Sequence, residues 1–302
     1  MDVSIIIVNF NTKELTRNCL ASIFEKTEGI DFEVIVSDNG SSDGSAEMIR
    51  AEFPQVILIE NDTNLGFGAA NNRGLKIAKG KYVFYLNSDT MLLNNAVKIF
   101  FDYWEKALNK NKIGALGAYL LDKNGNTTHS YGVYPTVRNM TYTLFRFFIS
   151  SLLGKFKQKN EKKSLIYTVD DKEIFGYVTG ADLFLKNAGE QFFDERFFMY
   201  FEETDLQYNF VKKRNLVTYV LKEPLIVHFE GASDKSYKRK YKAYDFRKKS
   251  SIYYWISCLK YFRKNSSIPW SVLLLKILVF LVWIFPLNIG TTKSFMWELM
   301  KI

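Results

Sequence analysis

The opening stretch, Val3-Ser4-Ile5-Ile6-Ile7-Val8, decides the fold, because an unbroken run of mostly β-branched residues is typical of a buried parallel strand. The mostly polar residues 9–12 form a turn after it. From Lys13 to Glu25 the apolar residues recur at helical spacing, at positions 15, 19, 20, 23 and 24. The chain therefore begins with a strand, a turn and a helix, which is the repeating unit of an α/β domain.

Three further strands continue this alternation through the first third of the chain. We expect them at residues 32–37, 56–60 and 81–86. Helices lie between them, one through Met48 and Ile49 and one near residues 71–78. Strands that alternate with helices predict an α/β fold with a doubly wound, mostly parallel central sheet flanked by helices.

The second half of the chain is less regular. Residues 131–172 carry aromatic residues and then lysines, which indicates a variable insertion. Strand character returns at 175–185, 217–220 and 224–228, and a helix is expected at 202–213. Residues 234–302 turn basic, then aromatic and then strongly apolar, which predicts a C-terminal helical extension.

Polar clusters follow the expected strands of the first half. They comprise residues 9–12, the run Asp38-Asn39-Gly40-Ser41-Ser42-Asp43-Gly44-Ser45, and Asn87-Ser88-Asp89. Open α/β sheets bind ligands outside the carboxyl ends of their strands, so we expect these clusters to lie side by side there. The functional interpretation therefore rests on several motifs.

The composition favours a globular protein with anionic partners. Of the 302 residues, 47% are hydrophobic and 24% charged, and the formal net charge is +9. Lysines gather at residues 155–163, which we interpret as solvated surface, and basic residues gather again at 235–249. For the second run, which precedes the apolar tail, a solvated surface and contact with an anionic membrane both remain open. Nucleic-acid binding is not expected, because the sequence has no zinc-finger, RNA-binding or helix-turn-helix motif.

The two cysteines, Cys19 and Cys258, indicate a reducing compartment. They are far apart and outside any CxxC motif, so no disulfide framework is expected. The apolar start after Met1 lacks the basic region of a signal peptide. Together these features predict that the N-terminal domain is cytoplasmic.

The apolar tail indicates membrane association. Residues 268–289 contain one charge, Lys276, and approach the roughly 20 residues of a membrane span. Aromatic and basic residues upstream of them are typical of membrane interfaces. Interfacial or re-entrant helices at the inner face of the cell membrane are favoured over a true span. An internal packing or oligomerisation helix is the alternative.

Eight short segments follow one another in a recognisable order: Val3–Asn11, Val36–Ser45, Asn64–Gly74, Leu86–Asp89, Thr179–Ala181, Phe193–Tyr200, Glu202–Leu206 and His228–Ser233. Together they resemble the family-two glycosyltransferases, and most closely their bacterial rhamnosyltransferase-like branch. The resemblance implies a GT-A nucleotide-diphospho-sugar transferase domain over residues 1–233. It also implies inverting transfer of a sugar from a nucleotide diphosphate to a hydroxyl of a glycan or lipid-linked glycan, in bacterial surface-polysaccharide synthesis.

The resemblance also assigns donor-binding residues: Asn9, Asp38, Asn39, Asn64, Gly66, Arg73, Asn87 and Gly180. Asp38 would hydrogen-bond the base or ribose of the donor, with a simple Asx-turn as the alternative. Arg73 would approach a phosphate, and Gly180 would let the backbone approach the sugar. The donor stays open between dTDP-rhamnose, which the resemblance suggests, and hexoses carried by UDP.

A metal site is expected after the fourth strand. Asn87-Ser88-Asp89 stands where the family often has Asp-x-Asp, so the resemblance makes Asp89 a ligand for Mn²⁺ or Mg²⁺. His228 resembles the family's distal metal ligand and would compensate for the missing carboxylate, in a ligand set that suits manganese. A purely structural histidine is the alternative.

The run Glu202-Glu203-Thr204-Asp205 matches the family's acidic pair. An acceptor hydroxyl needs a base to remove its proton during attack. Glu203 aligns with the second acid, which is Asp in most relatives, and is the candidate base, with Glu202 in reserve. Asp205 would cap the helix or organise the site. Asp182 either faces the acceptor or points to solvent.

A second function stays open: a catalytically weak, nucleotide-sugar-binding scaffold subunit of a membrane-bound assembly complex, with oligomers possible for either function. Asp38, Asp89, Glu203 and His228 favour the enzyme, and Asn87 in place of an acid favours the scaffold. A dinucleotide-binding dehydrogenase is not expected, because the glycine-rich run at residues 66–71 follows the third strand and lacks the third glycine.

Overall fold

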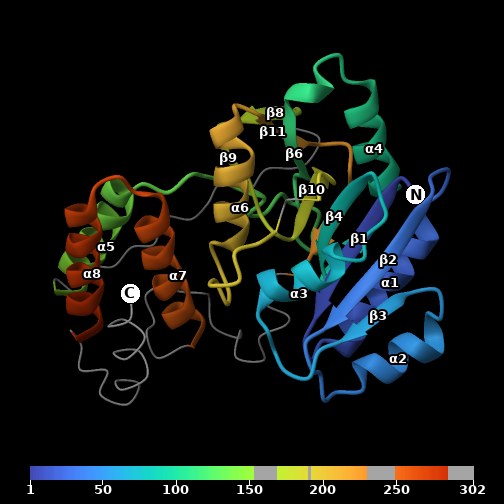
Figure 1. The fold of residues 1–302 in the computed structure, drawn as a ribbon, viewed down its shortest axis with the longest axis horizontal. Coiled ribbons are helices and arrows are strands. Elements are labelled where there is room, and N and C mark those ends of the chain that lie inside the picture. Colours follow the sequence, from blue (N-terminus) through green and yellow to red (C-terminus); the bar gives the residue numbers. More distant parts are fainter. Residues whose placement is uncertain (153–168, 190–191, 230–248, 285–302) are drawn as a thin grey trace. The chain divides into compact units, whose positions relative to one another are not determined.

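A computed structural model describes residues 1–152, 169–189, 192–229 and 249–284 (Figure 1). The chain forms two compact units. The first comprises residues 1–133, 163–195 and 203–239, and the second comprises residues 134–162, 196–202 and 240–302. The lysine run at 155–163, the basic residues 235–248 and the expected boundary after residue 233 lie outside the described residues.

The first unit is built on an eight-stranded sheet of order β3-β2-β1-β4-β10-β6-β11-β8. Its strands are β1 (Val3–Asn9), β2 (Phe32–Asp38), β3 (Ile57–Glu60), β4 (Tyr82–Asn87), β6 (Ile113–Ala118), β8 (Lys172–Ile174), β10 (Asp182–Lys186) and β11 (Val217–Leu221). β10 and β8 run antiparallel to their neighbours, and the other pairings are parallel. The predicted mostly parallel α/β sheet is therefore confirmed.

Strand β1 explains why this sheet has helices on both faces. Val3, Ile5 and Ile7 pack into the core on one face, whereas Ile6 packs into the core on the other, and all four are fully buried. Successive side chains of a strand point to opposite faces, so a continuous apolar run needs cover on both.

Helices supply that cover from both sides. α1 (Lys13–Lys26), α2 (Ser45–Glu52) and α4 (Ala96–Lys106) pack into the core that holds Ile5. α3 (Phe67–Leu75) and α6 (Glu202–Phe210) pack into the core that holds Ile6. Figure 1 shows α1, α2 and α3 alongside the first three strands.

Two small antiparallel ladders complete the first unit: β5 (Thr90–Leu92) with β12 (Ile226–His228), and β7 (Tyr131–Val133) with β9 (Gly176–Val178). The first ladder pairs Thr90 with His228, so it brings the chain that follows β4 next to a segment far away in the sequence.

Several element boundaries differ from the sequence-based expectation. The helix expected near residues 71–78 begins earlier, at Phe67. The strand expected at 175–185 is two strands, β9 and β10, separated by residues 179–181. The helix expected at 202–213 ends at Phe210, and a short 3₁₀ turn at Lys212–Arg214 follows it.

The described part of the second unit is helical: α5 (Val137–Leu152), α7 (Lys249–Asn265) and α8 (Pro269–Ile284). α8 packs against both α5 and α7. None of the helices in the described part of the chain combines the length and apolar character that a membrane span needs. Residues 285–289 of the expected apolar segment lie outside the described residues.

Candidate functional site

Three predicted donor-binding residues end neighbouring strands at one edge of the sheet. Asn9 is the last residue of β1, Asp38 of β2 and Asn87 of β4. In the strand register Asn9 pairs with Asp38, and Asn87 lies opposite Val8. The carboxyl ends of these parallel strands therefore bring the three residues to the edge where doubly wound sheets bind ligands.

Asp38 is buried, and both of its carboxylate oxygens accept hydrogen bonds from the protein. Asn9 Nδ2 donates to Oδ2 at 2.5 Å, and the backbone N–H of Ser41 donates to Oδ1 at 2.8 Å. The Ser41 hydroxyl accepts in turn from Asn9 Nδ2 at 3.1 Å. Asp38 thus organises its own turn, as the turn alternative requires, and its contact with a nucleotide stays a prediction.

Asparagine side chains tie the loop after β3 to the end of β2. Asn39 Nδ2 lies 3.3 Å from Asn64 Oδ1 and donates to the Gly66 carbonyl at 3.2 Å. The backbone N–H of Asn61 donates to the Asp38 carbonyl at 2.8 Å. Gly66 has a φ of 86°, which side-chain-bearing residues rarely adopt, so glycine is required just before α3. The predicted residues Asn39, Asn64 and Gly66 therefore form one wall beside Asp38.

Buried hydroxyl groups connect this turn to the loop after β4. The hydroxyls of Thr12 and Thr16 both donate to Asn9 Oδ1, at 2.6 and 2.7 Å. The Thr12 hydroxyl also lies 3.1 Å from the hydroxyl of Ser88. These bonds fix the Asn9 amide with its nitrogen toward Asp38. Sequence reasoning missed both threonines, although their spacing of four residues at the start of a helix was the available signal.

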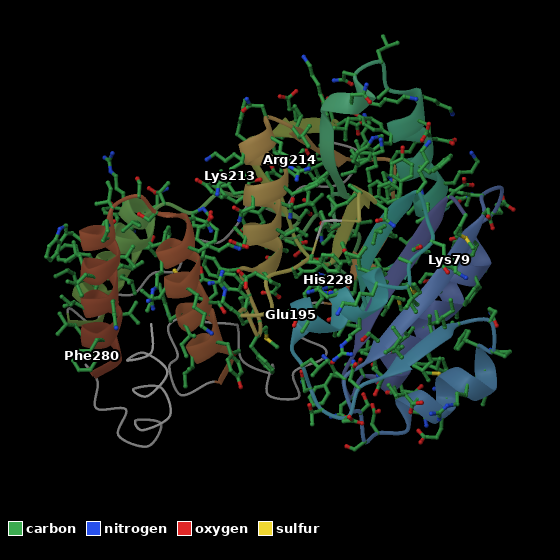
Figure 2. All side chains as sticks on the ribbon, in the orientation of Figure 1. Lys79, Glu195, Lys213, Arg214, His228 and Phe280 are labelled. Carbon is green, nitrogen blue, oxygen red and sulfur yellow. The ribbon has the colours of Figure 1, made fainter. Side chains whose placement is uncertain are left out.

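His228 lies in the first unit (Figure 2). It meets Asp89 there, although the two residues are far apart in the sequence. The β5–β12 ladder aligns them, and the N–H of Phe229 donates to the Asp89 carbonyl at 2.9 Å. His228 Nε2 lies 3.3 Å from Asp89 Oδ1, and the side chains are only 13% and 8% exposed.

This pair fits part of a divalent-cation site. Two adjacent ligands of an octahedral cation, each about 2.1 Å from it, stand about 3 Å apart, close to the separation of Nε2 and Oδ1. Among the described residues, no group of three or more His, Cys, Asp and Glu side chains gathers into a complete site. A cation held here would take its remaining ligands from phosphate oxygens and water, as cations in phosphate-binding sites commonly do.

Glu203 lies beside the glycine of the turn between β9 and β10. A Cβ at Gly180 would stand 3.6 Å from the Glu203 Cβ and only 3.1 Å from the Phe67 ring. Any side chain at position 180 would therefore crowd Phe67. Glycine leaves the backbone accessible next to the candidate base.

Gln207 fixes α6 in this position, and sequence reasoning missed it. Its Nε2 donates to the Val178 carbonyl at 2.8 Å, and its Oε1 accepts from the Val178 N–H at 3.0 Å. The side chain is fully buried and lies one helical turn after Glu203. Gln207 therefore joins β9 to the face of α6 that bears Glu203.

The surroundings of Glu203 suit a base. Burial raises the pKa of its carboxyl above the usual 4.5, and the N–H groups of Glu203 and Thr204 oppose that shift. Burial, and then the charge of Glu203, raise the pKa of Tyr177 to about 12. A carboxylate whose pKa moves toward neutrality accepts a proton more readily at physiological pH.

The chain enters α6 through two residues in the left-handed region. Tyr200 has a φ of 68° and Phe201 a φ of 67°, and aromatic residues adopt such values only under structural constraint. Within the second unit, α7 supplies that constraint. The Phe201 ring packs against the Tyr254 ring with centroids 5.1 Å apart, and the Ser257 hydroxyl donates to the Met199 carbonyl at 2.8 Å.

The other predicted residues occupy different surroundings. Arg73 is exposed in the last turn of α3, so it is not among the residues that the strand ends bring together. Glu202 is buried at the first position of α6, and Asp205 is buried in the same helix. Glu203 keeps partial exposure, so it remains the candidate base.

The alternative that Asp182 points to solvent is wrong. Its side chain is completely buried, and Oδ2 accepts a hydrogen bond from the backbone N–H of Ala118 on β6. Burial raises the pKa of Asp182 to about 7, whereas the Ala118 N–H, His228 and Thr179 oppose the shift. β10 lies between two strands and is covered on both faces, so even a polar residue on it has no path to water.

Residues 4–169 match the sequence profile of glycosyl transferase family 2. The chain belongs to this family. It is 29% identical over 230 residues to the N-acetylglucosaminyl-diphospho-decaprenol L-rhamnosyltransferase of Mycobacterium tuberculosis. The matched residues make up 69% of this chain and 70% of that relative. It is also 30% identical over 121 residues to the poly(ribitol-phosphate) beta-glucosyltransferase of Bacillus spizizenii, with 38% of this chain covered. This chain spans only 19% of that second relative's length.

Solved structures, one of them of a mannosyltransferase, share the fold of this family member. The mannosyltransferase PcManGT of Pyrobaculum calidifontis, in complex with GDP-Man and Mn²⁺, matches with a TM-score of 0.53 and 16% identity, over 99% of this chain and 72% of that one. S. aureus TarS 1-349 in complex with UDP matches with a TM-score of 0.51 and 14% identity, over 98% and 74%. The likeness confirms the predicted GT-A fold.

Proposed function

We propose that this protein is an inverting glycosyltransferase that moves a sugar from a nucleotide diphosphate to a hydroxyl of a lipid-linked glycan in bacterial surface-polysaccharide synthesis. The observation that carries the proposal is the convergence of Asp89 and His228, 3.3 Å apart, directly after the strand that ends in Asn87. Family membership and the lipid-linked acceptor in the name of the mycobacterial relative support it.

The donor nucleotide would bind at the ends of β1 and β2. Asn9 and Asp38 are fixed there by their mutual hydrogen bond, and the loop wall of Asn39, Asn64 and Gly66 stands beside them. The sugar would lie toward Gly180. The rhamnosyltransferase relative favours dTDP-rhamnose, and the neighbours with UDP and GDP-Man keep other donors as alternatives for the experiment below.

In the reaction, the acceptor hydroxyl transfers its proton to the Glu203 carboxylate while its oxygen forms a bond to the anomeric carbon of the sugar. The bond from that carbon to the diphosphate breaks, and the nucleoside diphosphate leaves with the electron pair. A Mn²⁺ or Mg²⁺ ion held by Asp89 and His228 would stabilise the charge that develops on the departing diphosphate. Attack opposite the leaving group inverts the anomeric configuration.

A lipid-linked acceptor would place this reaction at the inner face of the cell membrane. The net charge of +9 favours an anionic membrane surface as a partner. The catalytic unit would then work from the cytoplasmic side, where nucleotide sugars are available.

A thermal-shift screen tests the proposed function first. UDP, dTDP, GDP and their sugars are added to the protein with and without Mn²⁺, because a ligand that binds the native state raises the melting temperature. We expect a manganese-dependent shift with one nucleotide and, with the matching sugar donor, slow metal-dependent donor hydrolysis. Binding without hydrolysis or transfer would favour the scaffold subunit, and no shift with any nucleotide would overturn the proposed donor site.

A further inference from the structure

Helix α8 carries large apolar side chains on its exposed side. Trp270, Leu273, Leu274, Ile277 and Leu281 are 78%, 46%, 51%, 46% and 46% exposed. Their spacing of three, four and seven residues places them on one face of the helix, while Leu275 and Val279 are buried on another. These five exposed residues are called the α8 stripe below.

Helix α5, which packs against α8, carries a stripe of mixed character. Tyr142, Phe145 and Ile149 are 61%, 53% and 37% exposed and lie three and four residues apart. Arg138 and Arg146 are also exposed and continue the same spacing. The guanidinium of Arg146 lies 5.7 Å from the centroid of the Tyr142 ring, so cationic and aromatic groups share one face.

The charge of these helices selects the kind of partner. α5, α7 and α8 contain no Asp or Glu, but they contain Lys and Arg at positions 138, 146, 249, 260, 263, 264 and 276. A surface with exposed aromatic and aliphatic residues, cations and no acids is complementary to an anionic lipid interface. A second copy of the chain would instead oppose two cationic faces with no acids on these helices to pair them.

We propose that the α8 stripe and the exposed face of α5 form a docking surface for an anionic lipid bilayer, in which the apolar side chains enter the headgroup region and Arg138 and Arg146 pair with lipid phosphates. The inference deepens the proposed function by naming the surface that would hold the enzyme at its lipid-linked acceptor, and it rests on that function only for the acceptor. Binding to lipid itself requires neither donor nor acceptor, so the two proposals can fail separately.

Vesicle flotation of the whole protein tests this surface. Vesicles of phosphatidylcholine alone are compared with an equimolar mixture of phosphatidylcholine and phosphatidylglycerol. We expect binding to the anionic vesicles only. The double variant Trp270→Ser/Leu274→Ser should weaken it by on the order of tenfold or more, because two large apolar side chains no longer leave water. Arg138→Glu/Arg146→Glu should weaken it by roughly fivefold per lost cation.

A matched control uses exposed apolar residues of the first unit, Leu108 and Phe175, which are 106% and 90% exposed. Leu108→Ser/Phe175→Ser should bind anionic vesicles like the unaltered protein. All variants should keep their melting temperature and their nucleotide-induced shift in solution, which separates a docking defect from misfolding or loss of the donor site. The proposal is overturned by equal binding to neutral vesicles, by unchanged binding of the α8 variant, or by a stable dimer in sedimentation that the α8 variant abolishes.

Discussion

Asp38 is held by hydrogen bonds to its carboxylate at one sheet edge, whereas the helix that bears Glu203 is held by the two hydrogen bonds between Gln207 and Val178, called the Gln207 clamp below. The proposed donor-binding edge, called the donor end below, therefore depends on polar groups from β1, β2 and the turns that follow them. The part of α6 that bears Glu203, called the acid end below, depends on packing of α6 against β9. Because the two ends depend on different contacts, substitutions at one end should impair donor binding and substitutions at the other should impair transfer.

Replacing Asp89 by Ala gives the largest expected effect and acts on the donor end. The pair with His228 loses its carboxylate, so we expect the manganese-dependent thermal shift to disappear. Transfer should fall by about a thousandfold or more, because charge on the departing diphosphate is no longer neutralised. Asp62→Ala, which removes an exposed carboxylate from the loop after β3, is the matched control. A normal manganese-dependent shift in Asp89→Ala would remove Asp89 from the metal site.

Replacing Glu203 by Gln tests the acid end alone. The donor-induced thermal shift should persist, while turnover falls by about a hundredfold to ten-thousandfold, because the acceptor proton has no base. Glu203→Asp, which keeps a carboxylate on a shorter side chain, should recover part of the activity. Normal turnover in Glu203→Gln together with an inactive Glu202→Gln would transfer the role to Glu202.

The pH dependence of turnover sharpens the same assignment. Burial holds the pKa of Glu203 above 4.5, so activity that needs its carboxylate should rise with pH at values above that point. The rise should be absent from the residual activity of Glu203→Gln. An unchanged rise in that variant would assign it to another group.

Replacing Gln207 by Leu tests whether the clamp positions the base. The Val178 N–H and carbonyl lose buried partners, at a cost of about 1–3 kcal/mol for each unsatisfied group. Turnover should fall roughly tenfold to a hundredfold through misplacement of α6, while the KM for the donor changes little. Gln55→Leu, at an exposed position, should leave both unchanged. An equal loss of donor binding in Gln207→Leu would contradict a role confined to the acid end.

Local patterns were sufficient to predict the sheet edge at which Asn9, Asp38 and Asn87 lie. The β-branched run of β1 and the polar residues after β1, β2 and β4 predicted the sheet edge, because a parallel sheet aligns its carboxyl ends. The contribution of Thr12 was not predictable in the same way. Its hydroxyl connects Asn9 to Ser88, and only the folded chain brings Ser88 within 3.1 Å.

Glu203 was predicted from resemblance, but the contacts that position it were not. Gln207 and Val178 are close only because α6 packs against the sheet beside β9. Tyr200 and Phe201 adopt the left-handed conformation, but neither is glycine or asparagine, the residues from which a sequence predicts it. The position of β10 was not predictable either. This antiparallel strand lies between β4 and β6, which come much earlier in the sequence, and the placement buries Asp182.

Replacing Asp182 by Asn is expected to have the smallest effect, and to act on stability. The folded pKa of about 7 exceeds the ordinary value of 3.8, so between these values the folded protein holds a proton that the unfolded chain has lost. The stabilisation from this proton is complete below pH 3.8 and disappears as the pH rises through 7. Because one pKa unit corresponds to about 1.4 kcal/mol, the whole difference is at most about 4 kcal/mol.

The Asn amide does not ionise, yet its oxygen can still accept from Ala118, so Asp182→Asn should melt several degrees higher than the unaltered protein at pH 8. The advantage should shrink as the pH falls toward 4. Melting curves are recorded with a chelator, since a cation at Asp89 and His228 would lower the pKa of a neighbouring carboxyl. Asp102→Asn is the control, because Lys98 holds the pKa of the Asp102 carboxyl below 3.8. Ionised Asp102 therefore stabilises the folded protein, so this variant should lose stability at pH 8. A pH-independent difference for Asp182→Asn would mean that the Asp182 carboxyl is already ionised in the folded protein over this pH range.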